Sequence, residues 1–118
     1  MAKIVVIEDD YRLADVLKRY LSFHKHEIFV AYNGIDGINL VRREQPQMVI
    51  MDLFLPDFNG EQIGEILRAT PQLAKIKLIL MSGSPEYLSD KVSLAFDAIV
   101  SKPVNLVEFT ASISQLLG

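Results

Sequence analysis

Acidic residues stand at the ends of two apolar runs that lie far apart in the chain. Residues 4–7 are followed by Glu8 and Asp9, and residues 48–51 are followed by Asp52. Carboxylates gathered in one place repel each other: at an effective dielectric constant near 20, two unit charges about 4 Å apart interact by about 4 kcal/mol. Either the pKa values rise or a cation neutralises the group. A donor set of oxygens, without His or Cys, suits a hard divalent ion, and we expect Mg²⁺.

Two later apolar runs end on residues that complement such a metal. Ser82 offers a hydroxyl and Lys102 offers an amine. With Asp52 as the nucleophile, the metal, the hydroxyl and the amine would neutralise charge on phosphoryl oxygens, so the set can receive a phosphoryl group. Taken singly, each residue also has a structural explanation. Asp9 or Asp10 can cap a helix, Ser82 can cap the next element, and Lys102 can be an ordinary surface lysine.

Five apolar runs alternate with helical patterns, and these elements must position the site. Strands are expected at residues 4–7, 27–31, 48–53, 76–81 and 98–100. Apolar stripes predict five helices, at Leu13, Val16, Leu17, Tyr20 and Leu21; at Ile35, Ile38 and Val41; at Ile63, Ile66 and Leu67; at Leu88, Val92 and Ala95, with Pro85 at the helix start; and at Leu106, Phe109, Ile113, Leu116 and Leu117.

This alternation predicts an α/β fold with a doubly wound five-stranded parallel sheet and helices on both faces. Five strands favour the flavodoxin-like order 2-1-3-4-5, whose switch point lies between strands one and three. The carboxyl ends of those two strands carry Glu8, Asp9 and Asp52, so we expect the three acids to meet in one crevice.

Composition narrows the class of protein. The chain has 118 residues, half of them apolar, which predicts one folded domain over residues 1–118 and excludes intrinsic disorder. The net charge of −3, with no basic block beyond Arg42-Arg43, argues against direct binding of nucleic acid. There is no cysteine for a disulfide or a thiolate site. No apolar run approaches the roughly 20 residues of a membrane span, and the start lacks a signal-peptide layout, so we expect a cytoplasmic protein.

The residues at these strand ends also occur together in a known family. Over its whole length the chain resembles the receiver domain of two-component response regulators, including chemotaxis regulators, through Glu8-Asp9, residues 52–60, Ser82-Gly83 and Lys102-Pro103. The resemblance implies a signalling phosphoacceptor, with self-catalysed phosphorylation and slow autodephosphorylation, and not a turnover enzyme. The donor would be a sensor histidine kinase or a histidine phosphotransfer protein. A phosphorylation-dependent homodimer is compatible with it, and the output target is open.

The same resemblance implies a role for each site residue. Asp52 would accept the phosphoryl group. Ser82 and Lys102 would bind its oxygens, and the peptide bond before Pro103 would be cis. Output would come from a population shift on the face made by the fourth helix, the fifth strand and the fifth helix. The Mg²⁺ ligands would be oxygens of one sheet edge: Asp9, Asp52, the backbone carbonyl of Phe54 and, through a water, Glu8.

The chain departs from the family pattern on the output side. The position three before the lysine is Ile99, where the family has an aromatic residue that rotates inward. Ala95 and Phe96 stand where small residues are usual, so either Phe96 or another side chain reports the switch, or the coupling is altered. Phe54 and Ser84 flank the site, and we expect them to tune hydrolysis, because a bulky Phe54 hinders a water in line with phosphorus.

Three alternatives come from other classes. A Mg²⁺-dependent phosphohydrolase of the haloacid-dehalogenase type needs a second Asp two residues after the nucleophile, and that position is Phe54. A flavodoxin relative needs hydroxyls and amides after strand one, where Glu8-Asp9-Asp10 would repel a phosphate. A docking module that keeps the fold without phosphorylation has Ile99 as its support. No Walker A or Gly-x-Gly-x-x-Gly loop is present to hold a nucleotide.

Overall fold

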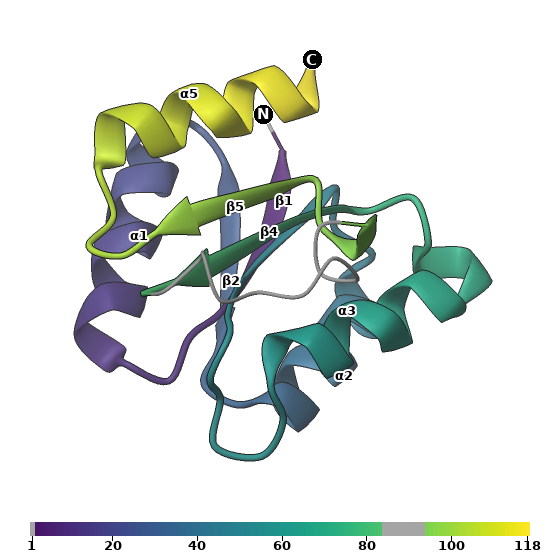
Figure 1. Cartoon of the computed structure of the whole chain (residues 1–118). Coiled ribbons are helices and arrows are strands. Elements are labelled where there is room, and N and C mark those ends of the chain that lie inside the picture. The colour runs from purple at the N-terminus through teal and green to yellow at the C-terminus, as the bar shows by residue number, and fades with distance from the viewer. Residues whose placement is uncertain (1, 84–93) are drawn as a thin grey trace.

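A computed structural model describes residues 2–83 and 94–118 of the chain. Five parallel strands form one sheet in the order β2-β1-β3-β4-β5 (Figure 1). The predicted fold class and strand order are therefore confirmed, and each strand lies within a residue or two of its predicted position. The strands are β1 (Lys3–Ile7), β2 (Glu27–Ala31), β3 (Met48–Asp52), β4 (Lys77–Ser82) and β5 (Ala98–Ser101).

Helices cover both faces of the sheet. Helices α1 and α5 lie on one face, and α2 and α3 lie on the other (Figure 1). The helices within the described residues are α1 (Tyr11–Phe23), α2 (Gly34–Glu44), α3 (Gly60–Ala69) and α5 (Leu106–Leu117), with a short 3-10 helix η1 (Pro71–Leu73). Of the fourth predicted helix, Pro85, Leu88 and Val92 lie outside the described residues, as does Ser84.

The position of β3 in the middle of the sheet explains why its sequence does not alternate between apolar and polar residues. All five residues of β3 are buried, because one half of the core packs on each face of the sheet. Val49 and Met51 face the helices α2 and α3, whereas Met48 and Ile50 face α1 and α5. An apolar run covered on both sides is what a parallel sheet requires. The run therefore carries Asp52 out of the core at the carboxyl end of the strand.

Two residues of the predicted helix stripes are not in the core. Val16 of α1 is 46% exposed, and Ile35 of α2 is 54% exposed. The fully covered side of α1 is narrower than the predicted stripe and consists of Ala14, Leu17 and Leu21. Ile35 lies in the first turn of α2, just past the carboxyl end of β2, so it projects from the sheet edge that carries the acids.

Candidate functional site

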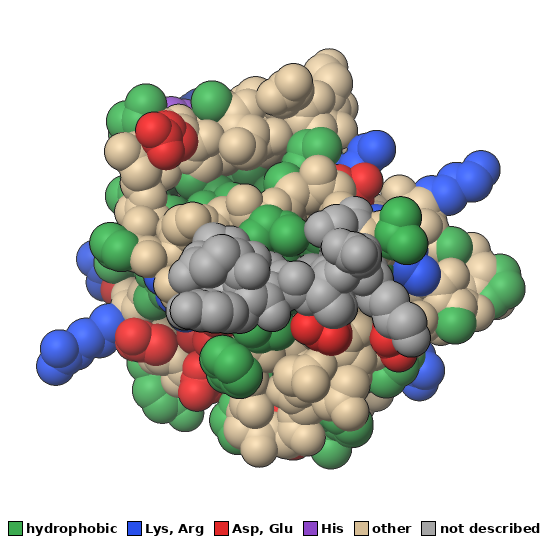
Figure 2. All heavy atoms as spheres, in the orientation of Figure 1, with side chains coloured by type: hydrophobic (Ala, Val, Ile, Leu, Met, Phe, Trp, Pro, Cys, Tyr) green, Lys and Arg blue, Asp and Glu red, His purple; other side chains and the backbone are tan. Residues whose placement is uncertain are grey.

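The carboxyl ends of β1 and β3 bring the three predicted acids together. Ile7 of β1 pairs with Met51 of β3 in the parallel ladder. Glu8 and Asp52, which follow them, therefore lie together at the carboxyl ends of the two strands. One carboxylate oxygen from each of Glu8, Asp9 and Asp52 lies within 4.8 Å of the others. Glu8 is fully buried, Asp52 is 8% exposed, and Asp9 is exposed. In Figure 2, acidic side chains lie beside hydrophobic ones on the left, the side toward which β5 points in Figure 1.

Lys102 supplies the positive charge of the cluster. Its Nζ lies 2.9 Å from Oε1 of Glu8 and 3.1 Å from Oδ1 of Asp52, so one amine bridges two buried carboxylates. Burial lowers the pKa of the Lys102 amine, but the hydrogen bonds and charges of Glu8 and Asp52 outweigh that effect and raise it. Burial likewise raises the pKa of Glu8, although its bond to Lys102 opposes the rise. The positive charge of Lys102 therefore partly offsets the cost of burying the carboxylates of Glu8 and Asp52.

Neighbouring strand ends aim Lys102 at the acids. Ser82 is the last residue of β4, is buried, and pairs with Ser101 of β5. The carbonyl of Ser82 accepts a hydrogen bond from the Lys102 N–H at 2.9 Å, which continues the ladder one residue past β5. The peptide bond between Lys102 and Pro103 is cis. Ser82 and Lys102 thus lie at the same sheet edge as the acids, although they come from different strands.

In the acidic run Glu8-Asp9-Asp10, the side chains of Asp9 and Asp10 have different roles. The carboxylate of Asp10 accepts hydrogen bonds from the N–H groups of Arg12 at 2.9 Å and Leu13 at 3.3 Å, so Asp10 is the N-cap of α1. The Asp10 N–H in turn donates to Oε2 of Glu8 at 3.0 Å. Asp10 therefore has the capping role considered in the sequence, and Asp9 keeps its carboxylate at the cluster.

The loop after Asp52 is folded tightly over the end of β3. The Gly60 N–H donates to the Leu53 carbonyl at 2.6 Å, and Phe54 forms an isolated bridge with Asn59. A Cβ on Gly60 would lie 2.8 Å from the carbonyl oxygen of Asp52, so only glycine allows this approach. The Phe54 side chain is 75% exposed beside the site. Phe54, whose backbone carbonyl is one of the predicted metal ligands, is the second residue of this loop after Asp52.

Asp57 has a structural role that the sequence analysis did not assign. Its Oδ1 accepts a hydrogen bond from the Gly34 N–H at 2.7 Å, and its Oδ2 accepts one from the Ile35 N–H at 2.9 Å. These are the first N–H groups of α2, so Asp57 ties the loop after β3 to a second helix. Removal from water raises the pKa of Asp57, but the backbone donors outweigh it and hold the pKa below its usual value. No local pattern marks Asp57, because its two partners in α2 lie 23 and 22 residues away.

The altered output position is packed between the sheet and α3. Ile99 pairs with Leu80 and is partly buried against the core cluster that contains Phe96. Phe96 is only 6% exposed. Its ring lies so close to α3 that a Cβ on Gly64 would be 2.8 Å from it. One turn later, Arg68 donates to the Ala95 carbonyl at 2.8 Å. Ala95 and Phe96, just before β5, are therefore held against α3.

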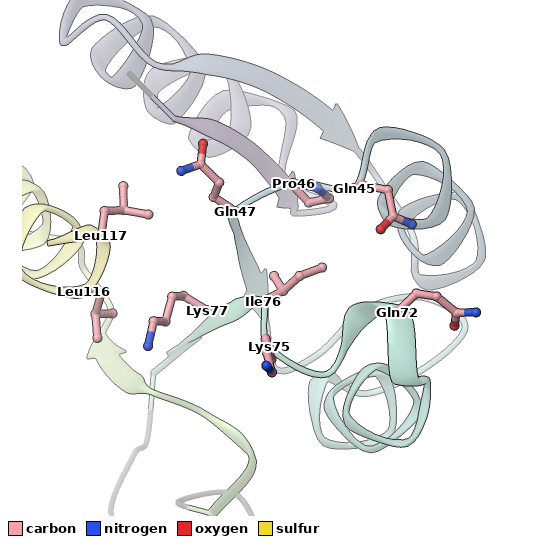
Figure 3. Close-up of a pocket in the computed structure, with 9 residues that line it drawn as sticks. All are labelled: Gln45, Pro46, Gln47, Gln72, Lys75, Ile76, Lys77, Leu116 and Leu117. Atoms are coloured by element: carbon pink, nitrogen blue, oxygen red, sulfur yellow. The ribbon is translucent and has the colours of Figure 1, made fainter.

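The opposite edge of the sheet also has a cavity, but with different chemistry. A cavity of 390 Å³ lies where β3 and β4 begin and where α5 ends (Figure 3). Three glutamines and two lysines line it, and the side chain of Lys77 points toward the end of α5. No carboxylate and no histidine is among its lining residues. Among the residues that the structure describes, the group of acids that could bind a metal lies at the carboxyl ends of the strands.

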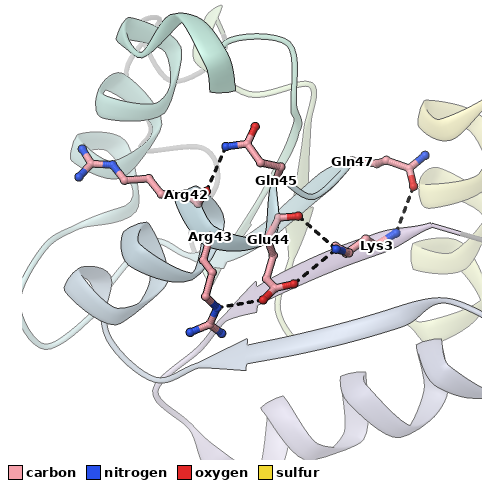
Figure 4. Close-up of polar contacts among 6 residues, drawn as sticks. All are labelled: Lys3, Arg42, Arg43, Glu44, Gln45 and Gln47. Carbon is pink, nitrogen blue, oxygen red and sulfur yellow. Dashed lines mark hydrogen bonds and ion pairs between the residues drawn. The ribbon is translucent and has the colours of Figure 1, made fainter.

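Ion pairs at the opposite ends of the strands connect the start of β1 to the end of α2. The Lys3 Nζ contacts the carbonyl of Glu44 at 3.3 Å and its Oε1 at 3.4 Å, and the Arg43 Nε donates to Oε2 of Glu44 at 2.9 Å (Figure 4). The bond from Arg43 and the charge of Lys3 lower the pKa of Glu44. Lys3 begins β1 and Glu44 ends α2, so these contacts are structural and join a strand to its covering helix.

Comparison with known proteins agrees with this geometry. The family model of the response regulator receiver domain matches residues 4–114. The chain belongs to this family. Receiver domains of this family are signalling phosphoacceptors that work with histidine kinases or phosphotransfer proteins. No helix within the described parts of this receiver domain is long and apolar enough to cross a membrane.

Solved structures of other receiver domains superpose over nearly the whole chain. The receiver domain of a DNA-binding response regulator from Colwellia psychrerythraea 34H is 32% identical, with a TM-score of 0.85, over 98% of this chain and 97% of the other. The response regulator TrrA from Thermotoga maritima, solved with Mg²⁺ and BeF, is 28% identical, with a TM-score of 0.88, over 98% and 99%. The chemotaxis response regulator CheY4 of Vibrio cholerae is 17% identical and, with a TM-score of 0.91 over 98% of each chain, shares the fold.

Proposed function

We propose that this receiver domain accepts a phosphoryl group on Asp52, from a histidine kinase or a histidine phosphotransfer protein, in a Mg²⁺-dependent reaction. The observation that carries the proposal is the position of Lys102. Its ammonium contacts the carboxylates of both Glu8 and Asp52, at the point where three acids converge. A partly buried amine held against the acids that could bind a metal, one of which is the nucleophile, has a direct use in phosphoryl transfer, because it can hold an anionic group beside the metal.

The acidic cluster fits a magnesium ion. Its donors are all oxygens, and they lie close enough together to share one small cation. Asp9 and Asp52 would bind the ion directly, together with the backbone carbonyl of Phe54, and Glu8 would bind through a water. When bound, the ion supplies positive charge to the phosphoryl oxygens that approach Asp52. Lys102 now contacts both Asp52 and Glu8. Once the charge of these acids is neutralised, its amine would turn toward the phosphoryl oxygens.

The transfer itself needs one bond to form and one to break. A carboxylate oxygen of Asp52 attacks phosphorus, the P–N bond of the donor's phosphohistidine breaks, and the imidazole leaves with the electron pair. Lys102 and the hydroxyl of Ser82 would stabilise the charge on the phosphoryl oxygens. Water later cleaves the acyl phosphate. The exposed ring of Phe54 stands beside that site, and we assign it the role of slowing the approach of this water.

The output would be a shift in population on the face that contains β5 and α5. Most of the fourth helix, which would complete this face, lies outside the described residues. With Ile99 in place of an aromatic residue, the signal cannot depend on a ring that rotates at this position. The close packing of Phe96 on α3 makes a large movement of Phe96 costly as well, so we place the response in the backbone around Ser82 and Lys102.

Phosphorylation by a small donor tests the proposal. Wild type and Asp52→Asn are incubated with acetyl phosphate, with Mg²⁺ or with excess EDTA, and intact mass is measured. Wild type with Mg²⁺ should gain one phosphoryl group, and the variant and the EDTA sample should gain none. Asp36→Asn, which changes an exposed residue of α2, is the matched control and should behave as wild type. Equal labelling of Asp52→Asn would overturn the proposal, and no labelling of the wild type would favour the docking-module alternative.

A further inference from the structure

Two exposed tyrosines pair at the edge of the phosphoacceptor site. The rings of Tyr11 and Tyr32 meet edge to face, with centroids 4.4 Å apart and planes at 63°. Although they cover each other in part, Tyr11 is 68% exposed and Tyr32 is 42% exposed. Neither ring is among the residues of the two core clusters. A large aromatic pair left in water is more typical of a contact surface than of a folding element.

The pair stands close to the reacting groups. Tyr11 is the first residue of α1, two positions after Asp9 of the acidic cluster. Tyr32 directly follows Ala31, whose carbonyl accepts a hydrogen bond from the Glu8 N–H at 3.0 Å. Both tyrosines therefore flank the ends of β1 and β2, on the side of the acidic cluster away from β3.

A hollow adjoins the second tyrosine. A cavity of 280 Å³ lies between β2 and α2, and Tyr32 is one of its walls. Val30, Ala31 and Leu40 give it an apolar interior, and Asp36, Asn39 and Arg43 give it a polar rim. An aromatic platform beside an apolar hollow, enclosed by polar groups, has the layout of a docking site with one anchoring side chain.

We propose that the Tyr11–Tyr32 pair and this hollow bind the protein phosphodonor, and that the hollow receives an apolar side chain next to the donor's phosphohistidine. The inference rests on the proposed function. It extends the donor's footprint beyond the acidic cluster to the corner formed by β2 and α2, and it makes Tyr11 and Tyr32 determinants of donor specificity.

The occupant follows from the geometry of the transfer. Asp52 is 8% exposed, so the donor must press its surface against the rim in order to bring phosphorus within reach of the carboxylate, about 3–3.5 Å. Around Asp52 the carboxylates of Glu8 and Asp9 outnumber the one amine of Lys102, so the acids repel a phosphoryl group until a cation neutralises them. Affinity must therefore come from contacts beyond the charges. The tyrosine rings and the hollow are apolar surface at the right place, and a small donor such as acetyl phosphate cannot reach them.

Kinetics with two donors separate docking from chemistry. The protein donor is a purified histidine phosphotransfer domain, phosphorylated beforehand and selected because it phosphorylates the wild-type chain; the small donor is acetyl phosphate. The variants are Tyr11→Ala, Tyr32→Ala, the double variant, Tyr32→Phe, and Asn39→Leu, which fills the hollow from the exposed side of α2. Phe23→Ala removes a ring that is 77% exposed at the other end of α1 and is the matched control.

We expect the double variant to lose about tenfold in kcat/KM with the protein donor, through KM, as for a lost aromatic anchor. Asn39→Leu should lose about threefold, and Tyr32→Phe should keep the wild-type value because the ring is retained. All variants should match the wild type with acetyl phosphate, and Phe23→Ala should match it with both donors.

Three results would overturn the inference. The first is an unchanged kcat/KM with the protein donor in both the double variant and Asn39→Leu. The second is an equal loss with both donors, which would mean that the tyrosines support the chemistry itself. The third is a change in oligomeric state of the double variant by sedimentation, which would assign the surface to a second copy of the chain. Failure of the proposed function is a separate result, because acetyl phosphate would then not phosphorylate Asp52 in the wild type.

Discussion

Removal of the Lys102 charge is the sharpest test of how the site is held together. In Lys102→Met the methionine keeps most of the apolar stem, and it removes the ammonium that lies 2.9 Å from Glu8 and 3.1 Å from Asp52. Glu8 has no exposed surface, so water cannot replace the lost partner. Two carboxylates would then face each other with no positive charge between them. We expect a large loss of stability in metal-free buffer.

The size of the loss follows from the contacts. At an effective dielectric constant near 20, each contact of about 3 Å is worth about 5 kcal/mol before desolvation is counted. Breaking one side of a buried pair costs about 3–5 kcal/mol. The lower end applies, because the Lys102 side chain is 26% exposed and Glu8 can take up a proton. We therefore expect a loss of about 3 kcal/mol, which lowers Tm by roughly 10 °C.

Urea denaturation in EDTA at neutral pH measures this loss, with Lys75→Met as the matched control. Lys75 is exposed at the opposite edge of the sheet, and it forms no ion pair within the residues that the structure describes. Without the amine, the pKa of Glu8 in the folded state rises further. The folded value is already raised in the wild type and then lies further above the unfolded one, so the loss is greatest at high pH and fades as pH falls toward the unfolded value, about 4.3. Mg²⁺ should also narrow the gap. A loss below about 1 kcal/mol, or one equal to that of the control, would show that the Lys102 charge does not hold the acids together.

Other parts of the structure give further predictions. Asp57→Ala should cost about 1–2 kcal/mol in urea denaturation, because it removes two N–H acceptors from the start of α2; Asp15→Ala should cost under about 0.5 kcal/mol. Since the folded pKa of Asp57 is lowered, its contribution is present above the unfolded value of about 3.9 and is lost as pH falls through the folded value, so the gap to Asp57→Asn should close in acid; a constant gap would contradict this. Phe54→Ala should speed autodephosphorylation, measured as decay of the phosphorylated mass, and an unchanged rate would reject the role of its ring. Gly37→Ala should destabilise by about 1 kcal/mol, since a Cβ would lie 2.5 Å from Ile7 and overpacking outweighs the gain in helix propensity; a higher Tm would count against it.

Strand placement was predictable because the signal is local. The residues of β3 are apolar without alternation, and burial on both faces is the only condition under which such a strand is stable in a parallel sheet. Helix stripes were less reliable. Spacing alone placed Val16 and Ile35 in the core, yet the neighbouring elements cover less of each helix than the stripe suggested. The spacing of apolar residues in a helix does not show how much of that helix the sheet covers.

The amino-acid sequence is enough to name the residues at the strand ends, because strand ends and residue types are properties of short segments. Glu8, Asp9, Asp52, Ser82 and Lys102 could therefore be named before any contact was known. The contacts among them could be seen only in the folded molecule. Lys102 reaches Glu8 across 94 residues, Asp57 reaches α2 across 23, and Tyr11 meets Tyr32 at the site edge. Such contacts depend on how strands and loops are stacked in space, and that stacking is set by the packing of the whole core.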